Sequence, residues 1–173
     1  MPGDATVTEF SFSNHWTKFQ LIVDNLIKHF ECNKIVVKIH PTLEREAKKM
    51  GKSWKKIYKP TINRWISSGL KVYKGFESLH SILPYTSVAI IENSTSGIEC
   101  LMYDVPIISY GYPEYHWITF DMRHISQLRG AIENKFWYDK TKCQKWLTWY
   151  CSEYLCCDHD STVRRLSELL DLT

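Results

Sequence analysis

Short runs of β-branched and other apolar residues alternate along the chain with segments in which apolar positions recur at helical spacing. Residues 5–12 alternate between polar and apolar side chains and predict a strand. The apolar residues from Trp16 to Phe30 then predict a helix. Residues 34–39 predict a strand that stops at His40-Pro41, because proline lacks the N–H that a central strand needs.

The alternation continues through the middle of the chain. Residues 42–68 are polar and basic, and they predict one or two surface helices with breaks at Gly51 and Pro60. The next expected elements are a strand over 70–73, a short helix over 78–83 ended by Pro84, a strand over 88–91, a helix over 94–102 and a strand over 105–109. The strand over 88–91 is the most hydrophobic, and we expect it to be central. After about residue 120 the pattern predicts no further strand.

Alternating strands and helices with nearly continuous apolar strands predict an α/β fold, in which helices cover both faces of a parallel sheet. We expect residues 140–173 to form a C-terminal helical segment that packs on this sheet domain. Trp146, Trp149 and Tyr150 share one helix face in that segment. That aromatic face is either buried within this domain or a surface toward a second lobe.

Composition adds limits to this fold. The chain has 173 residues, 44% hydrophobic and 24% charged, which predicts one globular domain around a single core. A net charge of +3 does not by itself indicate a nucleic-acid or membrane partner. The six cysteines form no CxxC pair and the N-terminus has no signal-like segment, so we expect a reduced, cytoplasmic protein. The apolar runs are far shorter than the roughly 20 residues of a membrane span.

Ligands of an open parallel sheet bind at the carboxyl ends of its strands. The candidate loops are therefore those after 34–39, 88–91 and 105–109, and we expect all three on one rim. The first offers His40-Pro41, and the third is rich in glycine, proline and tyrosine. The second consists of Asn93, Ser94, Thr95, Ser96 and Gly97.

The hydroxyl-rich second loop stands at an expected helix start, where free N–H groups and the helix dipole favour an anion such as phosphate. Alternatively, one hydroxyl only caps the helix. Glu99, one turn further on, could accept hydrogen bonds from ribose hydroxyls or be a solvated helical glutamate. His40 could donate to a phosphate and, when protonated, stabilise a leaving group, or it could be a turn histidine.

Three other stretches favour structural roles. Cys151, Cys156, Cys157 and His159 are metal-ligand types but lack closed zinc spacing, so we interpret them as packing residues and expect no metal site. Residues 158–161 are typical of a turn and helix cap rather than a hydrolytic site. The basic run over 48–59 would suit nucleic acid or an anionic glycan, but we interpret it as a solvated helix face and expect no nucleic-acid partner.

The run VVKIHP, followed further along the chain by VAIIENSTSGIECLMYDVPIISYGYPEY, resembles the capsule polysaccharide biosynthesis glycosyltransferases, which include bacterial Kdo transferases. The resemblance covers roughly residues 6–132. It implies a Rossmann-like donor nucleotide-binding lobe of a two-lobe GT-B enzyme, here residues 1–139. It also implies that His40 and Pro41 lie by the phosphate and base of a CMP-sugar, and that Ser94 and Thr95 bind the phosphate. Glu99 would meet the ribose, and no metal or other cofactor is implied.

The chain departs from the family pattern in two respects. Thr95 replaces the commoner second serine and keeps the hydroxyl, whereas Cys100 and Tyr103 are substitutions of unassigned effect. The amino-terminal half, which in the family supplies acceptor contacts and an acidic catalytic residue, is missing from these residues. We therefore expect an excised donor domain, a diverged single-lobe protein or one part of a split enzyme.

Two functions remain open at this point. The first is the donor-binding part of a glycosyltransferase that takes a nucleotide sugar and a glycan or glycolipid acceptor, with His40 as its catalytic residue. Its acceptor lobe or partner subunit would lie outside this chain, and the full enzyme would associate with the inner face of the cell membrane. The second is a catalytically inactive α/β module that binds a nucleotide or a glycan.

Overall fold

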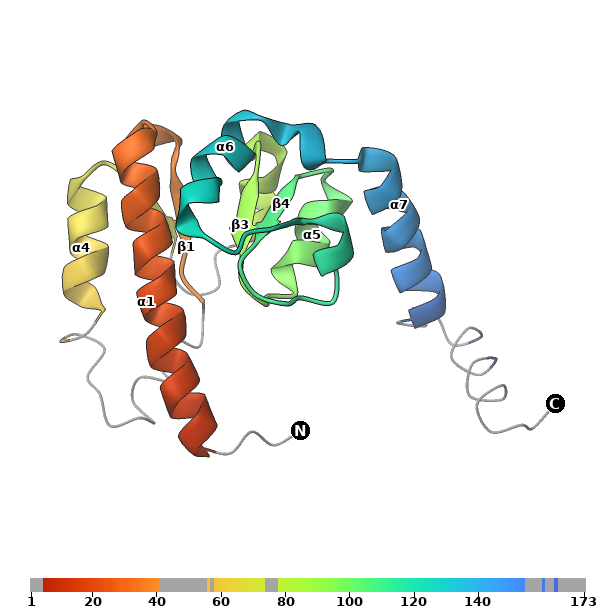
Figure 1. The fold of residues 1–173 in the computed structure, drawn as a ribbon, viewed down its shortest axis with the longest axis horizontal. Helices are drawn as coiled ribbons and strands as arrows, with labels where there is room; N and C mark the ends of the chain where they lie inside the picture. The colour runs from red at the N-terminus through yellow and green to blue at the C-terminus, as the bar shows by residue number, and fades with distance from the viewer. Residues whose placement is uncertain are drawn as a thin grey trace. The chain divides into compact units, whose positions relative to one another are not determined.

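The structure is a computed structural model that describes residues 5–40 (backbone alone for 5–14), 56, 58–73, 78–154, 160 and 164 (Figure 1). It is α/β, with helices and two small parallel sheets among the described residues. The chain divides into two compact units, residues 1–77 and residues 78–173. Each unit has its own hydrophobic cluster, so the expected single core is wrong. The reason is that each small sheet buries its own set of apolar side chains.

The first unit contains two helices and a two-stranded parallel sheet. Its elements are α1 (Ala5–His29), β1 (Val36–Lys38), α4 (Lys59–Ser67) and β2 (Lys71–Tyr73), with a 3-10 turn at Cys32–Lys34. The strands pair in the register Val36↔Lys71, Val37↔Val72 and Lys38↔Tyr73. Pro60, expected as a break, stands in the first turn of α4, where its missing N–H costs nothing.

Residues 5–12 are helical, and the strand expected there is wrong. The described strands pair only with one another, and none pairs with this segment. A helix satisfies the backbone within the segment itself, and each residue added to an existing helix contributes a hydrogen bond without a new nucleation cost. The local polar–apolar alternation is therefore outweighed by extension of α1.

Asp24 joins the two helices of the first unit. The fully buried Trp65 of α4 donates its Nε1–H to Asp24 Oδ1 at 3.1 Å, and Arg64 Nη2 donates to both carboxylate oxygens at 2.9 Å. Gln20 Nε2 also donates to Thr61 Oγ1 at 2.7 Å. The α1–α4 contact thus combines apolar packing with a satisfied buried donor.

The second unit contains a three-stranded parallel sheet in the order β3-β4-β5. Its main elements are β3 (Ala89–Ile91), α5 (Ser96–Met102), β4 (Ile107–Ser109), β5 (Phe120–Asp121), α6 (Leu128–Glu133) and α7 (Lys140–Trp149), followed by a π-helical turn at Tyr150–Tyr154. In register, Ala89 pairs with Ile107, and Ile108 pairs with Phe120. The short helix expected over 78–83 is two 3-10 turns, Leu79–Ser81 and Leu83–Tyr85, and Pro84 lies inside the second.

The central strand of this sheet is β4, not β3 as expected. All three residues of β4 are buried, whereas those of β3 are half-buried. The cause is β5, which pairs with the side of β4 that faces away from β3. The sequence did not predict β5 because its two residues are too few to show a periodic pattern. Ile107 and Ile108 point to opposite faces and are both buried, so both faces of β4 are covered.

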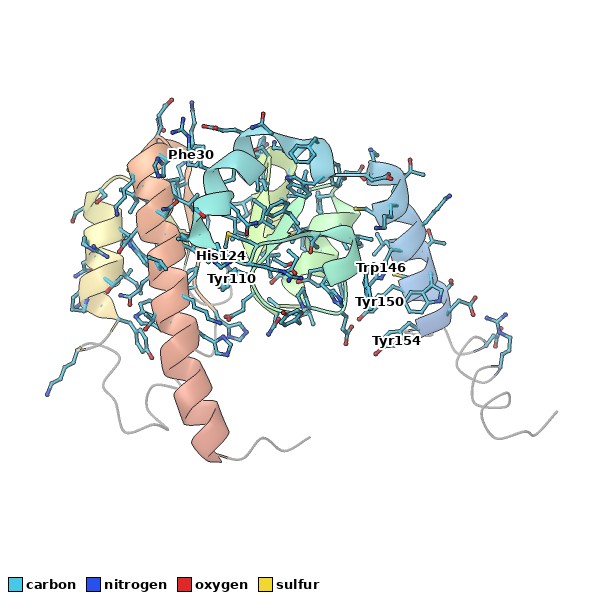
Figure 2. All side chains as sticks on the ribbon, in the orientation of Figure 1. Phe30, Tyr110, His124, Trp146, Tyr150 and Tyr154 are labelled. Atoms are coloured by element: carbon cyan, nitrogen blue, oxygen red, sulfur yellow. The ribbon has the colours of Figure 1, made fainter. Side chains whose placement is uncertain are left out.

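The aromatic face of α7 is divided between burial and exposure. Figure 2 shows Trp146, Tyr150 and Tyr154 along α7 and the turn after it, and Trp146 stacks on Tyr150 with 4.7 Å between ring centroids. Tyr150 is buried, but Trp149 remains 49% exposed. Burial within the second unit therefore accounts for part of this face only, and the boundary expected at 139/140 stays a prediction.

Among the helices described, none combines the length and apolar character needed to cross a membrane.

Replacing Asp24 with alanine should lower the free energy of unfolding by about 1–3 kcal/mol, because Trp65 Nε1 would lose its acceptor. The measurement is urea denaturation followed by tryptophan fluorescence. The matched change, Arg64→Ala, removes an exposed ion pair and should cost at most about 1 kcal/mol. Equal losses for the two variants would contradict the role given to the indole hydrogen bond.

Candidate functional site

The candidate site lies in the second unit, at the edge of the sheet where its parallel strands end. The loop of Asn93 follows β3, and the loop beginning at Tyr110 follows β4, so both leave the same edge. Tyr110 N donates to the Ile91 carbonyl at 3.1 Å, which keeps the two strand ends paired up to the loops. Two of the three loops expected on one rim therefore share it.

His40 follows β1 in the first unit, in the separate β1–β2 sheet. The single rim expected for all three loops is thus not found among the described residues, because β1 pairs with β2 rather than with β3 or β4. His40 is exposed. Pro41 lies outside the described residues, and so does most of the basic run over 48–59.

A close approach between Gly97 and Tyr115 shapes the loop. Tyr115 donates its hydroxyl hydrogen to the Ser94 carbonyl oxygen, and its ring lies against Gly97 in the first turn of α5. A Cβ at Gly97 would overlap Cζ and Oη of that ring. Glycine is therefore required there by space, and Tyr115 ties the β4 loop to the start of α5.

A second glycine brings the same two loops together. A Cβ at Gly111 would overlap the Asn93 side chain and would lie 2.9 Å from the Glu92 carbonyl oxygen. The chain after β4 thus passes directly against the chain after β3. Two contacts, at Gly97 and at Gly111, fix the relative position of these loops.

The three hydroxyl groups of the β3 loop differ in their contacts. Ser94 Oγ accepts a hydrogen bond from Ser96 N at 3.3 Å and is hydrogen-bonded to Ser96 Oγ. This supports the alternative in which Ser94 acts as a cap. Thr95 stands at the N-cap of α5 without a side-chain capping bond, and its exposed hydroxyl has no partner among the described residues. Thr95 is therefore the hydroxyl best placed to meet a ligand.

Glu99, assigned to the ribose, faces a histidine that sequence reasoning missed. Glu99 Oε2 lies 3.7 Å from His80 Nε2, and His80 Nδ1 lies 3.1 Å from the Tyr103 hydroxyl. The only sequence signal was a histidine in a short turn before a strand, which is not specific. Glu99 remains 40% exposed.

Two further polar side chains follow β5. Arg123 Nε donates to Asp121 Oδ2 at 3.3 Å, and its side chain is mostly exposed. His124, labelled with Tyr110 in Figure 2, is exposed as well. Because β5 runs parallel to β4, both residues leave the sheet at the edge that carries the other two loops. This edge therefore holds an arginine and a histidine that the sequence pattern did not indicate.

Burial keeps three side chains behind the loops neutral, namely Cys100, Tyr110 and Tyr115. It raises the pKa of the Cys100 thiol to about 12, with the nearby Glu99 carboxylate adding to the effect. It also raises the pKa of the Tyr110 and Tyr115 phenols, with smaller contributions from nearby acidic groups. Tyr115 is thus a stable hydrogen-bond donor at neutral pH, and Cys100 is not a nucleophile there.

Among the described residues, no group of three His, Cys, Asp or Glu side chains could hold a metal ion. Cys151 is a free thiol, whereas Cys156, Cys157 and His159 lie outside the described part of the chain. Asp160 is described, but its neighbours 158, 159 and 161 are not.

We compared the chain with family models, curated proteins and solved structures, and none of them matches.

Replacing Gly97 with alanine should destabilise the second unit by about 1–3 kcal/mol, because the new methyl group would displace the Tyr115 ring. Thermal unfolding measures the loss. The matched control is Gly130→Ala in α6, where a Cβ meets no atom within 4 Å, so that variant should be neutral or more stable. A Gly97→Ala protein as stable as the parent would disprove the close approach.

Alkylation should separate the cysteines by burial. At about pH 8, iodoacetamide should modify Cys32 and Cys151, which are half-buried, and spare Cys100 and Cys143, which are buried and have raised pKa values. Peptide mass spectrometry of the native protein gives the order of reaction. Modification of Cys100 as fast as Cys151 would contradict the buried position of its thiol.

Proposed function

We propose that this chain is the donor-binding lobe of a glycosyltransferase that uses a CMP-activated sugar, Kdo-like or sialic-acid-like, to build a capsule or surface polysaccharide. Its fold would be a Rossmann-like lobe of the GT-B type. The resemblance of VVKIHP and of the segment over 88–115 to the capsule glycosyltransferases supports this proposal.

The observation that carries the proposal is the β3–loop–α5 segment. A hydroxyl-rich loop leaves the carboxyl end of a parallel strand and opens a helix, with Thr95 exposed at the N-cap and Glu99 partly exposed in the first turn. Nucleotides bind to α/β folds at this position, where backbone N–H groups meet the phosphate. The separation of Thr95 and Glu99 by one helical turn suits a phosphate and its ribose.

In the proposed reaction the acceptor hydroxyl attacks the anomeric carbon and CMP leaves with the bonding electron pair. Thr95 and the amides at the start of α5 stabilise the phosphate, while Ser94 keeps the loop in place through its bonds to Ser96. The resemblance implies that His40, which lies in the first unit, donates a further hydrogen bond to the phosphate. A monophosphate leaving group needs a divalent ion less than a diphosphate does.

The proposal leaves the acceptor side to other residues. A second lobe or a partner subunit would supply the acceptor contacts and the carboxylate that takes the proton of the acceptor hydroxyl. The acceptor would be a glycan or glycolipid. The enzyme would work in the cytoplasm, at the inner face of the cell membrane.

A second candidate is a nucleotide- or glycan-binding module without catalytic activity. The engagement of Ser94 Oγ with Ser96 favours it, because a hydroxyl used as a cap is less available to a substrate phosphate. This candidate predicts nucleotide binding without glycosyl transfer when the acceptor-binding part is supplied.

Calorimetric titration should show binding of CMP at millimolar affinity or better, in preference to UDP, GDP and ADP. Thr95→Val, which removes the hydroxyl but keeps the shape, should weaken CMP binding by up to about a hundredfold. Glu99→Ala should weaken CMP binding but leave the affinity for free phosphate nearly unchanged, because its expected partner is the ribose.

Ser94→Ala is the control for helix capping. It should lower the melting temperature as well as the affinity, whereas Thr95→Val should change the affinity alone. Selective binding to none of the four nucleotides would refute the donor site. If His40→Ala binds CMP as tightly as the parent, His40 is only a turn residue.

A further inference from the structure

We propose that His80, held by Tyr103, positions the Glu99 carboxylate for the ribose hydroxyls of a nucleoside. The inference rests on the proposed function, because it takes the Glu99 side of α5 as the ribose contact. It adds a positioning residue that comes from outside the loops at the carboxyl edge of the sheet.

His80 contacts one side chain of α5 and one at the C-terminal end of that helix. Glu99 lies in α5, and Tyr103 is its C-cap residue, four positions later in the chain. His80 meets both of them: Nε2 lies 3.7 Å from Glu99 Oε2, and Nδ1 lies 3.1 Å from the Tyr103 hydroxyl. The His80 and Tyr103 rings also approach to 5.6 Å between centroids. One imidazole thus contacts both Glu99 and the residue that caps its helix.

The backbone under His80 is fixed by its own cap. Ser78 Oγ accepts a hydrogen bond from His80 N at 3.2 Å, and Ser81 Oγ donates to the Ser78 carbonyl at 2.8 Å. An isolated surface ion pair contributes little, since two long side chains must lose freedom to form it. Here the histidine is already held on the backbone side by Ser78 and on the ring side by Tyr103.

This arrangement leaves part of Glu99 available. Its Oε2 faces His80, and its other oxygen has no partner among the described residues. A carboxylate held in one orientation loses less conformational entropy when a ribose diol binds to it. When the Tyr103 hydroxyl donates to Nδ1, the imidazole carries its proton on Nε2, the nitrogen that faces Glu99.

Among the described residues, the turn of His80 packs mainly against α5 and the turn at Leu83–Tyr85. The polar side chains that contact the His80 ring there are Glu99 of α5 and Tyr103 at the C-cap of that helix. Removal of the His80 side chain therefore acts first on Glu99 and Tyr103.

Cytidine is the probe for this proposal, because it has the ribose and the base but no phosphate to titrate. His80→Ala should bind cytidine about two- to fivefold more weakly than the wild type, the size of an exposed ion pair. His80→Gln keeps a donor near Glu99, so it should retain most of the wild-type affinity.

Two controls make the result specific. His29→Ala removes an exposed histidine of the first unit and should behave as the wild type. Tyr103→Phe removes the bond to Nδ1 and should weaken cytidine binding in the same direction as His80→Ala, at an unchanged melting temperature. Wild-type cytidine affinity in His80→Ala, with CMP binding retained, overturns the inference and leaves the proposed function intact. A wild-type protein that binds neither CMP nor cytidine overturns both.

Discussion

The contact between Tyr115 and Gly97 is the constraint on which the candidate site depends. The ring occupies the space that any side chain at residue 97 would need, and the hydroxyl donates to the Ser94 carbonyl. The other contacts described between the ends of β3 and β4 and their loops are the close approach at Gly111 and the bond from Tyr110 N to the Ile91 carbonyl. The direction in which α5 leaves the sheet, and hence the positions of Thr95 and Glu99, follows from this packing.

The same tyrosine connects the loops to the C-terminal helix. Tyr115 packs edge-on against Trp146, with ring centroids 6.2 Å apart, and Trp146 stacks on Tyr150. Tyr150 in turn donates its hydroxyl hydrogen to Glu114 at 2.9 Å, next to Tyr115 in the chain. Helix α7 is thus a support for the β4 loop, and its aromatic residues act on the site through packing rather than by contact with a ligand.

The sequence predicted the elements whose apolar pattern is local and missed the contacts made between distant residues. Strands β3 and β4 and helix α5 were predicted within two residues, because each has a continuous apolar run or a cap signal. Strand β5 was missed because two residues are too few to show a periodic pattern. Residues 5–12 were predicted as a strand from their polar–apolar alternation, but extension of helix α1 outweighed that local pattern. His80 was missed because its proposed role depends on its contacts with Glu99 and Tyr103. A single sequence does not show that these residues meet.

The most direct test of the account is to record which backbone amides of the isotope-labelled protein shift in NMR spectra when CMP is added. If the β3 loop holds the phosphate and α5 the ribose, the largest shifts fall on Thr95, Ser96 and Gly97, with smaller ones at Glu99. Shifts confined to residues 140–154, or none at all, would contradict the claim that this loop is a nucleotide site.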